Sequence, residues 1–286
     1  MILHPDLVLA GPDAAAAHAS AGHRFHRGRN LLDPRAAEWD DTPPLPSDPL
    51  YWDDLIRNSI RIGLDAARRT FKPALCVWTL MAGIAALYYL VPATHAAFLA
   101  LETLQQATGP LFPTIGMGLS VGVIVETIKV LMAGPGKRRW TMENTLNALF
   151  NFAVFGLMGL THYYRYAFQE DFFGRGTSLD VLIPKVMFDQ FVWTVIFANP
   201  YQTVLFLWKS HGFRWREVTS QIFPFKAFWG TRMLPVLIGN WTFWIPMASI
   251  VYCFPSDLQI PLSILAVTIW VLVLSVLTSS RHHEND

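Results

Sequence analysis

The chain has 286 residues, of which 22 are Lys or Arg and 21 are Asp or Glu, and its formal net charge is +1. Charged residues make up 15% of the chain, against about 25% in an ordinary soluble domain, and 19 of the 43 lie within the first 72 residues. Too little charge remains after residue 72 to cover a soluble surface, and no basic stripe indicates a nucleic-acid-binding protein. We therefore expect the chain after residue 72 to be embedded in a membrane.

The first fifty residues are rich in Ala, Pro, Asp and His. Such a segment buries too little apolar surface to offset the entropy lost on ordering, so we predict a disordered tail over 1–50. Residues 51–72 combine apolar side chains with several Arg residues, which is typical of an amphipathic helix lying on an anionic membrane surface. Cys76 and Cys253 both lie in apolar stretches without metal-ligand spacing, and we expect them to be buried, inert thiols.

A membrane-spanning helix needs about 20 mostly apolar residues. Six segments meet this requirement, namely 73–92, 111–133, 145–167, 181–207, 233–254 and 258–279. The shorter stretch 94–108 contains Glu102, Gln105 and Gln106 and is interpreted as a connecting helix at the interface. The sequence thus predicts an all-α integral membrane protein with about six transmembrane helices. Its expected parts are the tail (1–50), the amphipathic helix (51–72), an extra span with its connector (73–110), a main transmembrane domain (111–279) and a C-terminal tail (280–286).

Basic residues orient these spans, because Lys and Arg accumulate on the cytoplasmic side of a membrane. With six spans, 14 Lys and Arg residues after position 50 fall on one side of the membrane. They lie in 51–72, in alternate connections and after the last span. The opposite connections contribute three, all near span ends: Arg165, Arg175 and Lys185. This bias favours six spans and predicts that both termini lie on the cytoplasmic or matrix side.

The second predicted span has a polar face and a small-residue face. Glu126 and Lys129 are three residues apart, so they can pair on one side of a helix. Gly118 and Gly122 form a G-x-x-x-G pattern, which allows another helix to approach closely. We therefore expect a tight helix contact beside a carboxylate.

Other predicted spans also carry polar side chains, which are costly within a bilayer and usually face a partner or water. They are Asn151 and His162 in the third span, Lys185, Asp189 and Gln190 in the fourth, and Asn240 in the fifth. Lys185 and Asp189 are four residues apart and can reach each other, but Asp189 is shorter and deeper. Asp189 therefore has the greater need for a wet cavity or a partner from another helix.

Three functional interpretations of these polar residues remain open. They could line a wet path for ions or small polar solutes, or they could form interhelical pairs that fix packing without conduction. The third interpretation, an intramembrane enzyme, lacks a catalytic motif such as H-E-x-x-H or G-x-S-x-G in the sequence.

Several motifs after residue 111 resemble the Mpv-seventeen/peroxisomal membrane protein twenty-two-kilodalton family. The segment Lys185-Val-Met-Phe-Asp189-Gln190 resembles the family's Lys-x-x-x-Asp-Gln signature. The remaining similar residues are Asn240, Trp241, Trp244 and Pro246 in an Asn-Trp-x-x-Trp-Pro-like segment with one inserted residue, Trp270 and Ser275 in a terminal Trp-x-x-x-x-Ser spacing, and Gly156, Gly159 and His162 upstream. The family's upstream Gly-Pro pair and Trp are missing here. The resemblance covers residues 111–279.

The resemblance implies a small integral membrane protein of an organellar or related membrane, with members thought to form weakly selective pores. We therefore expect a pore or channel-like protein, not an enzyme, that passes small solutes or ions without a cofactor or metal. The alternative is a non-conducting membrane scaffold. The expected partners are the lipid bilayer, small solutes or ions and further copies of the chain, but no nucleic acid. The tail composition favours a bacterial inner membrane, with a mitochondrial inner or peroxisomal membrane as the alternative.

Overall fold

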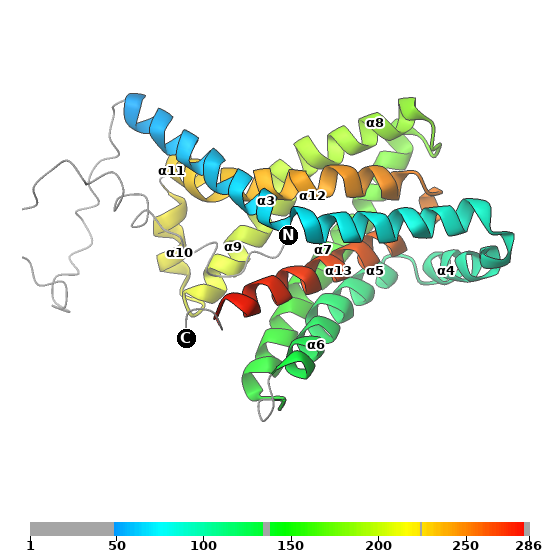
Figure 1. The fold of residues 1–286 in the computed structure, drawn as a ribbon, viewed down its shortest axis with the longest axis horizontal. Coiled ribbons are helices and arrows are strands. Elements are labelled where there is room, and N and C mark those ends of the chain that lie inside the picture. Colours follow the sequence, from blue (N-terminus) through cyan, green and yellow to red (C-terminus); the bar gives the residue numbers. More distant parts are fainter. Residues whose placement is uncertain (1–48, 134–137, 224, 283–286) are drawn as a thin grey trace, which may run out of the picture.

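The computed structural model describes residues 49–133, 138–223 and 225–282, and side chains within 52–273. The tail predicted over 1–50 lies almost entirely outside these residues, as do residues 283–286 of the predicted C-terminal tail. Every regular element in the described part of the chain is helical (Figure 1). In chain order these elements are α3 (Pro49–Leu90), the short 3-10 helix η2 (Pro92–Thr94), α4 (His95–Thr108), α5 (Leu111–Met117), η3 (Gly118–Ile124), α6 (Val125–Met132), α7 (Met142–Phe173), α8 (Leu179–Met187), η4 (Phe188–Ala198), α9 (Asn199–Ser210), α10 (Trp215–Ile222), α11 (Phe225–Phe228), η5 (Trp229–Met233), α12 (Leu234–Tyr252) and α13 (Ser256–His282).

Five helical segments of the described chain are long and apolar enough to cross a membrane: Trp52–Leu90, Leu111–Met132, Leu179–Ser210, Phe225–Tyr252 and Ser256–Val273. Many of their large apolar side chains point outward, as Ile196 does with 71% of its surface exposed. In water such an exposed surface would be unfavourable, whereas in a bilayer lipid covers it. The chain is therefore an all-α protein with the properties of a multi-pass membrane protein.

The third predicted span, 145–167, lies on α7. This helix has 32 residues and is not one of the five apolar segments, because Asn147, Asn151 and His162 interrupt its apolar sequence. The structure thus identifies five of the six predicted spans by length and composition.

The predicted amphipathic helix and the predicted first span are one continuous helix, with no break at residue 72. The helix α3 contains 42 residues and continues through Pro73, although proline lacks the N–H for the preceding turn. Ser59, Gly63 and Ala67 are buried on one face, and α3 packs along α12 (Figure 1). A Cβ atom on Gly63 would lie 2.9 Å from the carbonyl oxygen of Pro235. This close contact on the N-terminal side of Pro73 holds the whole helix against α12.

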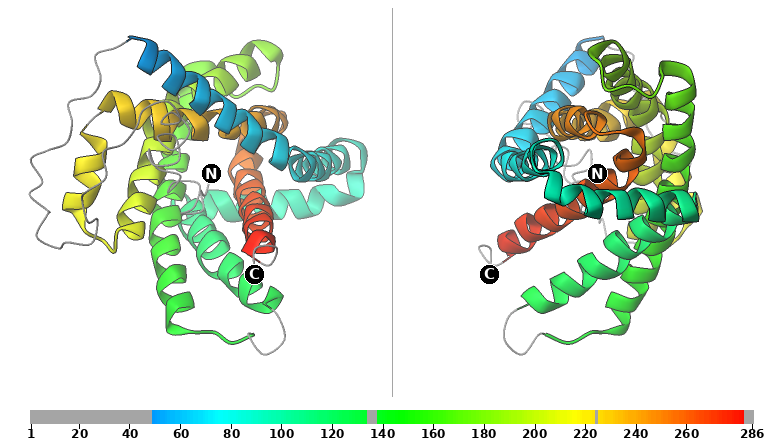
Figure 2. Two further views of the ribbon diagram at one scale, coloured as in Figure 1. Left: turned by 60° about the vertical axis from the view of Figure 1, so that its left-hand side comes forward. Right: turned by 90° about the vertical axis from the view of Figure 1, so that its right-hand side faces the viewer.

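The helices α5, η3 and α6 form one continuous rod that pairs with α7 as a hairpin (Figure 2). The predicted glycines lie in this contact. A Cβ atom on Gly122 would be 2.7 Å from the backbone nitrogen of Phe152, and one on Gly159 would be 2.1 Å from the carbonyl oxygen of Pro113. Gly118 and Gly156 face Phe152 and Thr114 in the same way. The absence of side chains at these positions lets the two backbones touch.

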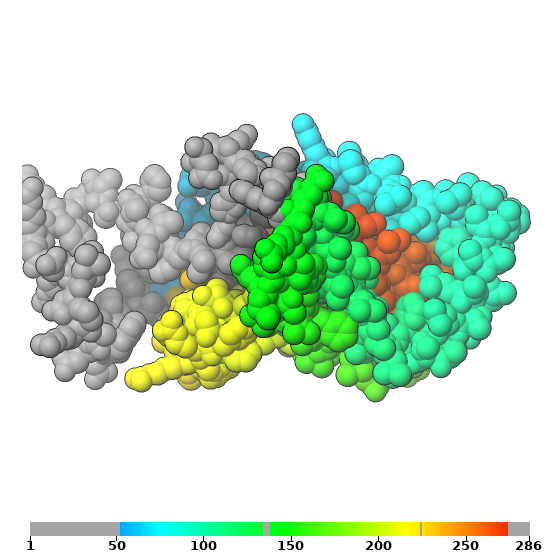
Figure 3. Space-filling view, turned by 90° about the horizontal axis from the view of Figure 1, so that it is seen from below, coloured from blue at the N-terminus to red at the C-terminus, as the bar shows by residue number. Residues whose placement is uncertain are grey.

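The C-terminal helix α13 is the most buried of the five apolar segments. It contacts α3, α4, α5, α6, α7 and α12, and Figure 3 shows it between the α3–α4 region and the α5–α7 hairpin. Phe243 of α12 stacks on Trp270 of α13 with ring centres 3.8 Å apart. Because α13 touches both the α3–α12 pair and the α5–α7 hairpin, it joins the two halves of the bundle.

The remaining elements connect spans. The helix α4 occupies the stretch predicted as a connector, and α10 lies between α9 and α11. The expectation of buried thiols is wrong, because Cys76 and Cys253 are both exposed on the described structure. In a membrane protein an apolar stretch has one face against lipid, so an apolar sequence does not imply burial within the protein.

Candidate functional site

A cavity of about 70 Å³, lined by both polar and apolar side chains, lies among the helices. Its wall is formed by α5, α7, η4, α9, α12 and α13. The polar side chains in this wall are His162, Arg165, Tyr166, Asp189, Gln190, Trp193, Thr194, Asn199, Gln202, Asn240, Trp244 and Ser263. The part of the wall from Asp189 to Asn199 falls in the middle of the 32-residue apolar segment Leu179–Ser210, so the cavity lies at mid-depth in the helices.

An ion pair between α7 and η4 stands at the centre of the cavity wall. Arg165 Nη1 donates to Asp189 Oδ1 at 2.6 Å, and Arg165 is only 4% exposed. The second carboxylate oxygen of Asp189 accepts from Gln190 Nε2 at 3.3 Å. The carboxylate therefore has its partner on another helix, and both of its oxygens are hydrogen-bonded.

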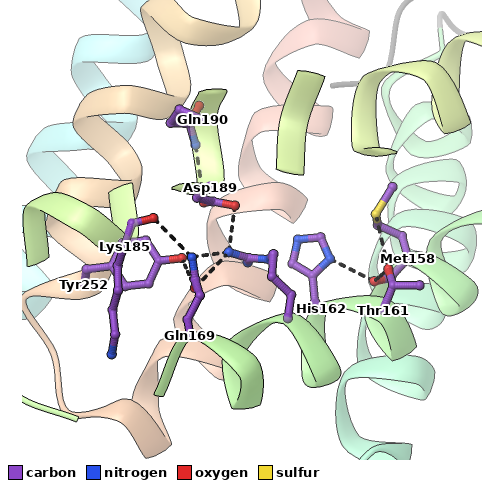
Figure 4. A network of polar contacts seen from close by, with 9 residues as sticks. Met158, Thr161, His162, Gln169, Lys185, Asp189, Gln190 and Tyr252 are labelled. Atoms are coloured by element: carbon purple, nitrogen blue, oxygen red, sulfur yellow. Dashed lines mark hydrogen bonds and ion pairs between the residues drawn. The ribbon is translucent and has the colours of Figure 1, made fainter. Parts of the chain in front are cut away.

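Two further side chains extend this ion pair into a network (Figure 4). Tyr252 of α12 accepts from Arg165 Nη1 at 2.7 Å and donates to Gln169 Oε1 at 2.6 Å. Gln169, which is fully buried, donates to the carbonyl oxygen of Lys185 at 3.1 Å. The network ties α7, α8, η4 and α12 together, and its members are too well packed for independent movement.

A wide helical turn shapes the η4 side of the cavity. η4 is a π-helix of 11 residues, in which N–H groups bond five residues back, as Asn199 N–H does to Thr194. The residue pairs 189–190, 193–194 and 198–199 all line the cavity. The wider turn thus presents two neighbouring side chains at each level to the interior, and π-helical segments frequently occur at functional sites.

Three polar atoms in the cavity wall have no hydrogen-bond partner among the described residues: Arg165 Nε, Trp193 Nε1 and Gln190 Oε1. The first two are donors and the third is an acceptor. The guanidinium carbon of Arg165 lies 5.9 Å from the Trp193 ring centre, so the two donors come from adjacent groups. Buried polar atoms without partners are costly, and all three belong to residues that line the cavity.

His162 lies in the wall between Met158 and the Asp189 network (Figure 4). Its Nδ1 is 2.8 Å from the carbonyl oxygen of Met158. A carbonyl oxygen only accepts, so Nδ1 carries a proton and a neutral ring has Nε2 as its acceptor.

The predicted intramembrane polar residues divide into two groups. His162, Asp189, Gln190 and Asn240 line the cavity, whereas Glu126, Lys129, Asn151 and Lys185 do not. Asn151 is buried with an unpartnered Oδ1. Lys185 is 1% exposed, and its amine points away from Asp189 (Figure 4) and has no hydrogen-bond partner in the described chain. Lys185 and Asp189 therefore do not form the contact that their spacing allows, because Arg165 is the cationic partner of Asp189.

Glu126 belongs to a separate contact in the α5–α7 hairpin. It pairs with Lys129 at 3.4 Å, as their spacing predicts, and accepts from Asn144 Nδ2 at 2.8 Å. The side chain of Lys129 is 42% exposed, so this residue lies at the surface. Asn144 also closes a capping box with Thr141 at the start of α7. This cluster joins two helices at their ends and contributes nothing to the cavity wall.

The residues of the Asn-Trp-x-x-Trp-Pro-like segment lie on α12. Trp244 lines the cavity beside Asn240, and Trp241 Nε1 donates to the carbonyl oxygen of Gln190 at 2.9 Å. Pro246 lies inside α12. Trp270 packs against Phe243 away from the cavity, and the side chain of Ser275 lies outside the described residues.

Arg165, Gln169, Trp193, Thr194 and Tyr252 are site residues that the sequence analysis did not identify. A signal existed for Arg165 and Gln169, because they follow His162 by three and seven residues and share a helix face with it. No pattern in the sequence distinguishes Trp193 or Tyr252 from the many other aromatic residues.

Within the described residues no group of three His, Cys, Asp or Glu side chains could hold a metal ion. No protein-family model, curated protein or solved structure matches the chain.

Proposed function

We propose that this chain forms a pore or channel-like path that passes small solutes or ions across a membrane. The observation that carries the proposal is a cavity with many polar lining residues, at mid-depth of the apolar segment Leu179–Ser210 and among helices whose outer faces are apolar. Unpaired polar groups are expensive in a bilayer, and here three of them belong to residues that line a cavity large enough for water. A hydrated interior site is what a conducting path needs.

The proposed topology has six spans, with α7 as the sixth. A helix of 32 residues is about 48 Å long at 1.5 Å per residue, which exceeds the bilayer's hydrocarbon core of about 30 Å. Its glycine contacts hold it along the α5–η3–α6 span. Arg165 and His162 of α7 line the cavity, so these polar residues face the interior of the bundle. A membrane position for α7 is therefore compatible with the high cost of exposing polar side chains to lipid.

The positions of the motif residues support the proposed pore. Asp189, Gln190, Asn240 and Trp244 come from two separate motifs and all line one cavity. Trp241 links the motifs directly through its hydrogen bond to Gln190. A site that gathers these residues gives the shared motifs a common role in the proposed pore.

The second candidate function is a non-conducting scaffold. The observation that favours it is the pairing of both buried carboxylates: Glu126 bonds to Lys129 and Asn144, and Asp189 bonds to Arg165 and Gln190. Such pairs fix helix packing without any need for transport. The scaffold candidate gives no role to the unpartnered atoms of the residues that line the cavity.

Reconstitution separates the two candidates. The purified chain is placed in liposomes and planar bilayers, and solute flux and single-channel current are recorded. Thr194→Leu fills part of the cavity, whereas Val192→Leu adds the same side chain on the exposed face of η4. For a pore we expect Thr194→Leu to lower flux about tenfold and Val192→Leu to leave it unchanged. Equal flux in protein-free and protein-containing liposomes would favour the scaffold.

A further inference from the structure

We infer that the cavity selects small uncharged molecules that both donate and accept hydrogen bonds, and that it rejects ions of the same shape. The inference rests on the proposed pore function and specifies its substrate class. Three features of the described structure support it: the charge balance of the cavity, the pattern of its free polar atoms and its size.

The charges that line the cavity cancel. The wall contains one cationic side chain, Arg165, and one anionic side chain, Asp189, and they contact each other at 2.6 Å. His162 is adjacent, with its Nδ1 proton bonded to the Met158 carbonyl. Lys185 does not line the cavity. For an ion that enters, the cavity has no uncompensated opposite charge. The free-energy cost of removing the ion's hydration shell is therefore not offset by attraction to the protein.

The free polar atoms form a mixed pattern. Among the residues that line the cavity, Arg165 Nε–H and Trp193 Nε1–H are two donors without a partner, and Gln190 Oε1 is an acceptor without one. A carbonyl or hydroxyl oxygen of a bound molecule can accept from the donors, while its own N–H or O–H donates to Gln190. A pure acceptor such as an anion leaves Gln190 unsatisfied, and a pure donor such as a cation leaves Arg165 and Trp193 unsatisfied.

The volume limits the bound molecule. At about 70 Å³ the cavity is roughly half the size of an engineered protein cavity of about 150 Å³ that binds benzene. Benzene has six heavy atoms, so a molecule of about four heavy atoms fits. Urea meets all three requirements, because it is neutral, has four heavy atoms and carries both N–H donors and a carbonyl acceptor. Water meets them too.

Three probes of one shape test the charge selection. Urea, nitrate and guanidinium are all planar with four heavy atoms, and their charges are 0, −1 and +1. Proteoliposomes of the full chain are mixed with each probe in isotopically labelled form, with valinomycin and potassium present to prevent charge build-up, and uptake is followed by rapid filtration. We expect urea flux to exceed the flux of either ion by about tenfold or more. Nitrate or guanidinium flux equal to urea flux overturns the inference but leaves the pore.

Asp189→Asn tests the cause of the selection. The amide can still accept from Arg165, but the Arg165 charge is no longer compensated. We expect nitrate flux to rise about tenfold while guanidinium flux stays low. Glu170→Gln is the matched control, because Glu170 pairs with Arg175 at 3.0 Å outside the cavity wall, and its selectivity should equal that of the parent. A folded Asp189→Asn protein with the parent's selectivity overturns the inference.

Trp193→Phe provides a second variant that keeps the ring and removes one donor. We expect it to lower urea flux several-fold without admitting either ion. Unchanged urea flux overturns the assigned role of the free donors. If none of the three probes enters the parent proteoliposomes faster than protein-free liposomes, both the inference and the proposed pore fail, so this result differs from failure of selection alone.

Discussion

Arg165 and Asp189 are 24 residues apart in the chain, and their side chains meet at 2.6 Å between α7 and η4. Both are buried, and the pair is further bonded to Tyr252 and Gln190. Neither charge has another oppositely charged partner within 4.0 Å among the described residues. The pair therefore couples the position of α7 to that of η4 across the cavity.

Removal of the arginine should be more damaging than removal of the whole pair. Arg165→Leu leaves the Asp189 carboxylate buried and unpaired, and we expect a loss of about 3–5 kcal/mol in stability. The double variant Arg165→Leu/Asp189→Leu removes both charges and should recover most of the loss. Thermal unfolding in detergent measures both. Arg175→Gln is the control, because the side chain of Arg175 is 77% exposed and its pair is worth little. A double variant less stable than Arg165→Leu would contradict this account.

The hydroxyl of Tyr252 should contribute measurably to the network. Tyr252→Phe removes the acceptor for Arg165 and the donor for Gln169 while keeping the ring. Because Gln169 is fully buried, its oxygen loses a partner, and we expect a cost of about 1–3 kcal/mol in unfolding free energy. Tyr164→Phe is the control: it also removes a tyrosine hydroxyl, but from an exposed ring on α7. Its effect on the unfolding free energy should be close to zero. Equal melting temperatures for Tyr252→Phe and the parent would show that the network does not stabilise the fold.

The fold and the site differ in how far the sequence predicts them. Helix positions follow from apolar runs, and the Gly118–Gly122 pattern gives the close contact of α5–η3 with α7 because a missing side chain has a direct geometric effect. The similar Ser59–Gly63–Ala67 spacing in α3 carries the same signal and explains its contact with α12. The pairing of Arg165 with Asp189 is different, because it depends on which helices are neighbours. A linear sequence specifies positions along one helix and not the partner across a gap.

The π-helix and the unpaired lysine show the same limit. Nothing in the sequence of η4 distinguishes a π-helix from an α-helix, yet the wider turn determines which side chains reach the cavity. Lys185 lies one ordinary helical turn before Asp189, so local spacing favours a pair that the tertiary contact with Arg165 replaces. The sequence therefore indicates some residues of the site, such as Asp189 and Gln190, whereas their partners and the contributions of Trp193 and Tyr252 require the three-dimensional arrangement.

Gly159 should tolerate no side chain. A Cβ atom there would lie 2.1 Å from the carbonyl oxygen of Pro113, so Gly159→Ala forces α5 away from α7. We expect a loss of about 1–3 kcal/mol or more. Gly83→Ala is the matched control, because this glycine is also within a helix and no atom lies within 4 Å of its added Cβ. That variant should be neutral or more stable, since alanine favours the helix by about 1 kcal/mol. Equal effects of the two substitutions would contradict the close contact.

Glu102 on the connecting helix α4 should make stability depend on pH. Burial raises the pKa of its carboxyl, and the nearby Asp257 raises it further. Because the pKa is higher in the folded state, the folded protein binds this proton more tightly than the unfolded chain does. The ionised group therefore opposes folding above the folded pKa, and the penalty disappears as the pH falls toward the unfolded value of about 4.3. We expect Glu102→Gln to raise the melting temperature at pH 8 more than at pH 4. Thr103→Ala changes an exposed neighbour without a carboxyl group, and its effect on the melting temperature should be the same at both pH values. An equal effect of Glu102→Gln at pH 8 and pH 4 would contradict the prediction.

The six-span topology makes a prediction about sidedness. Arg138 and Trp215 lie in connections at the end of the bundle where basic residues gather, whereas Gln106 and Thr177 lie in the alternate connections. All four are exposed. We place single cysteines at these positions in a background without Cys76 and Cys253, because both native thiols are exposed and would react. A membrane-impermeant thiol reagent applied from one side should label positions 138 and 215 together, and positions 106 and 177 only from the other side. If α7 did not cross the membrane, positions 138 and 177 would be labelled from the same side. That result would reject the six-span model and would also remove the reason for Arg165 and His162 to need an interior site.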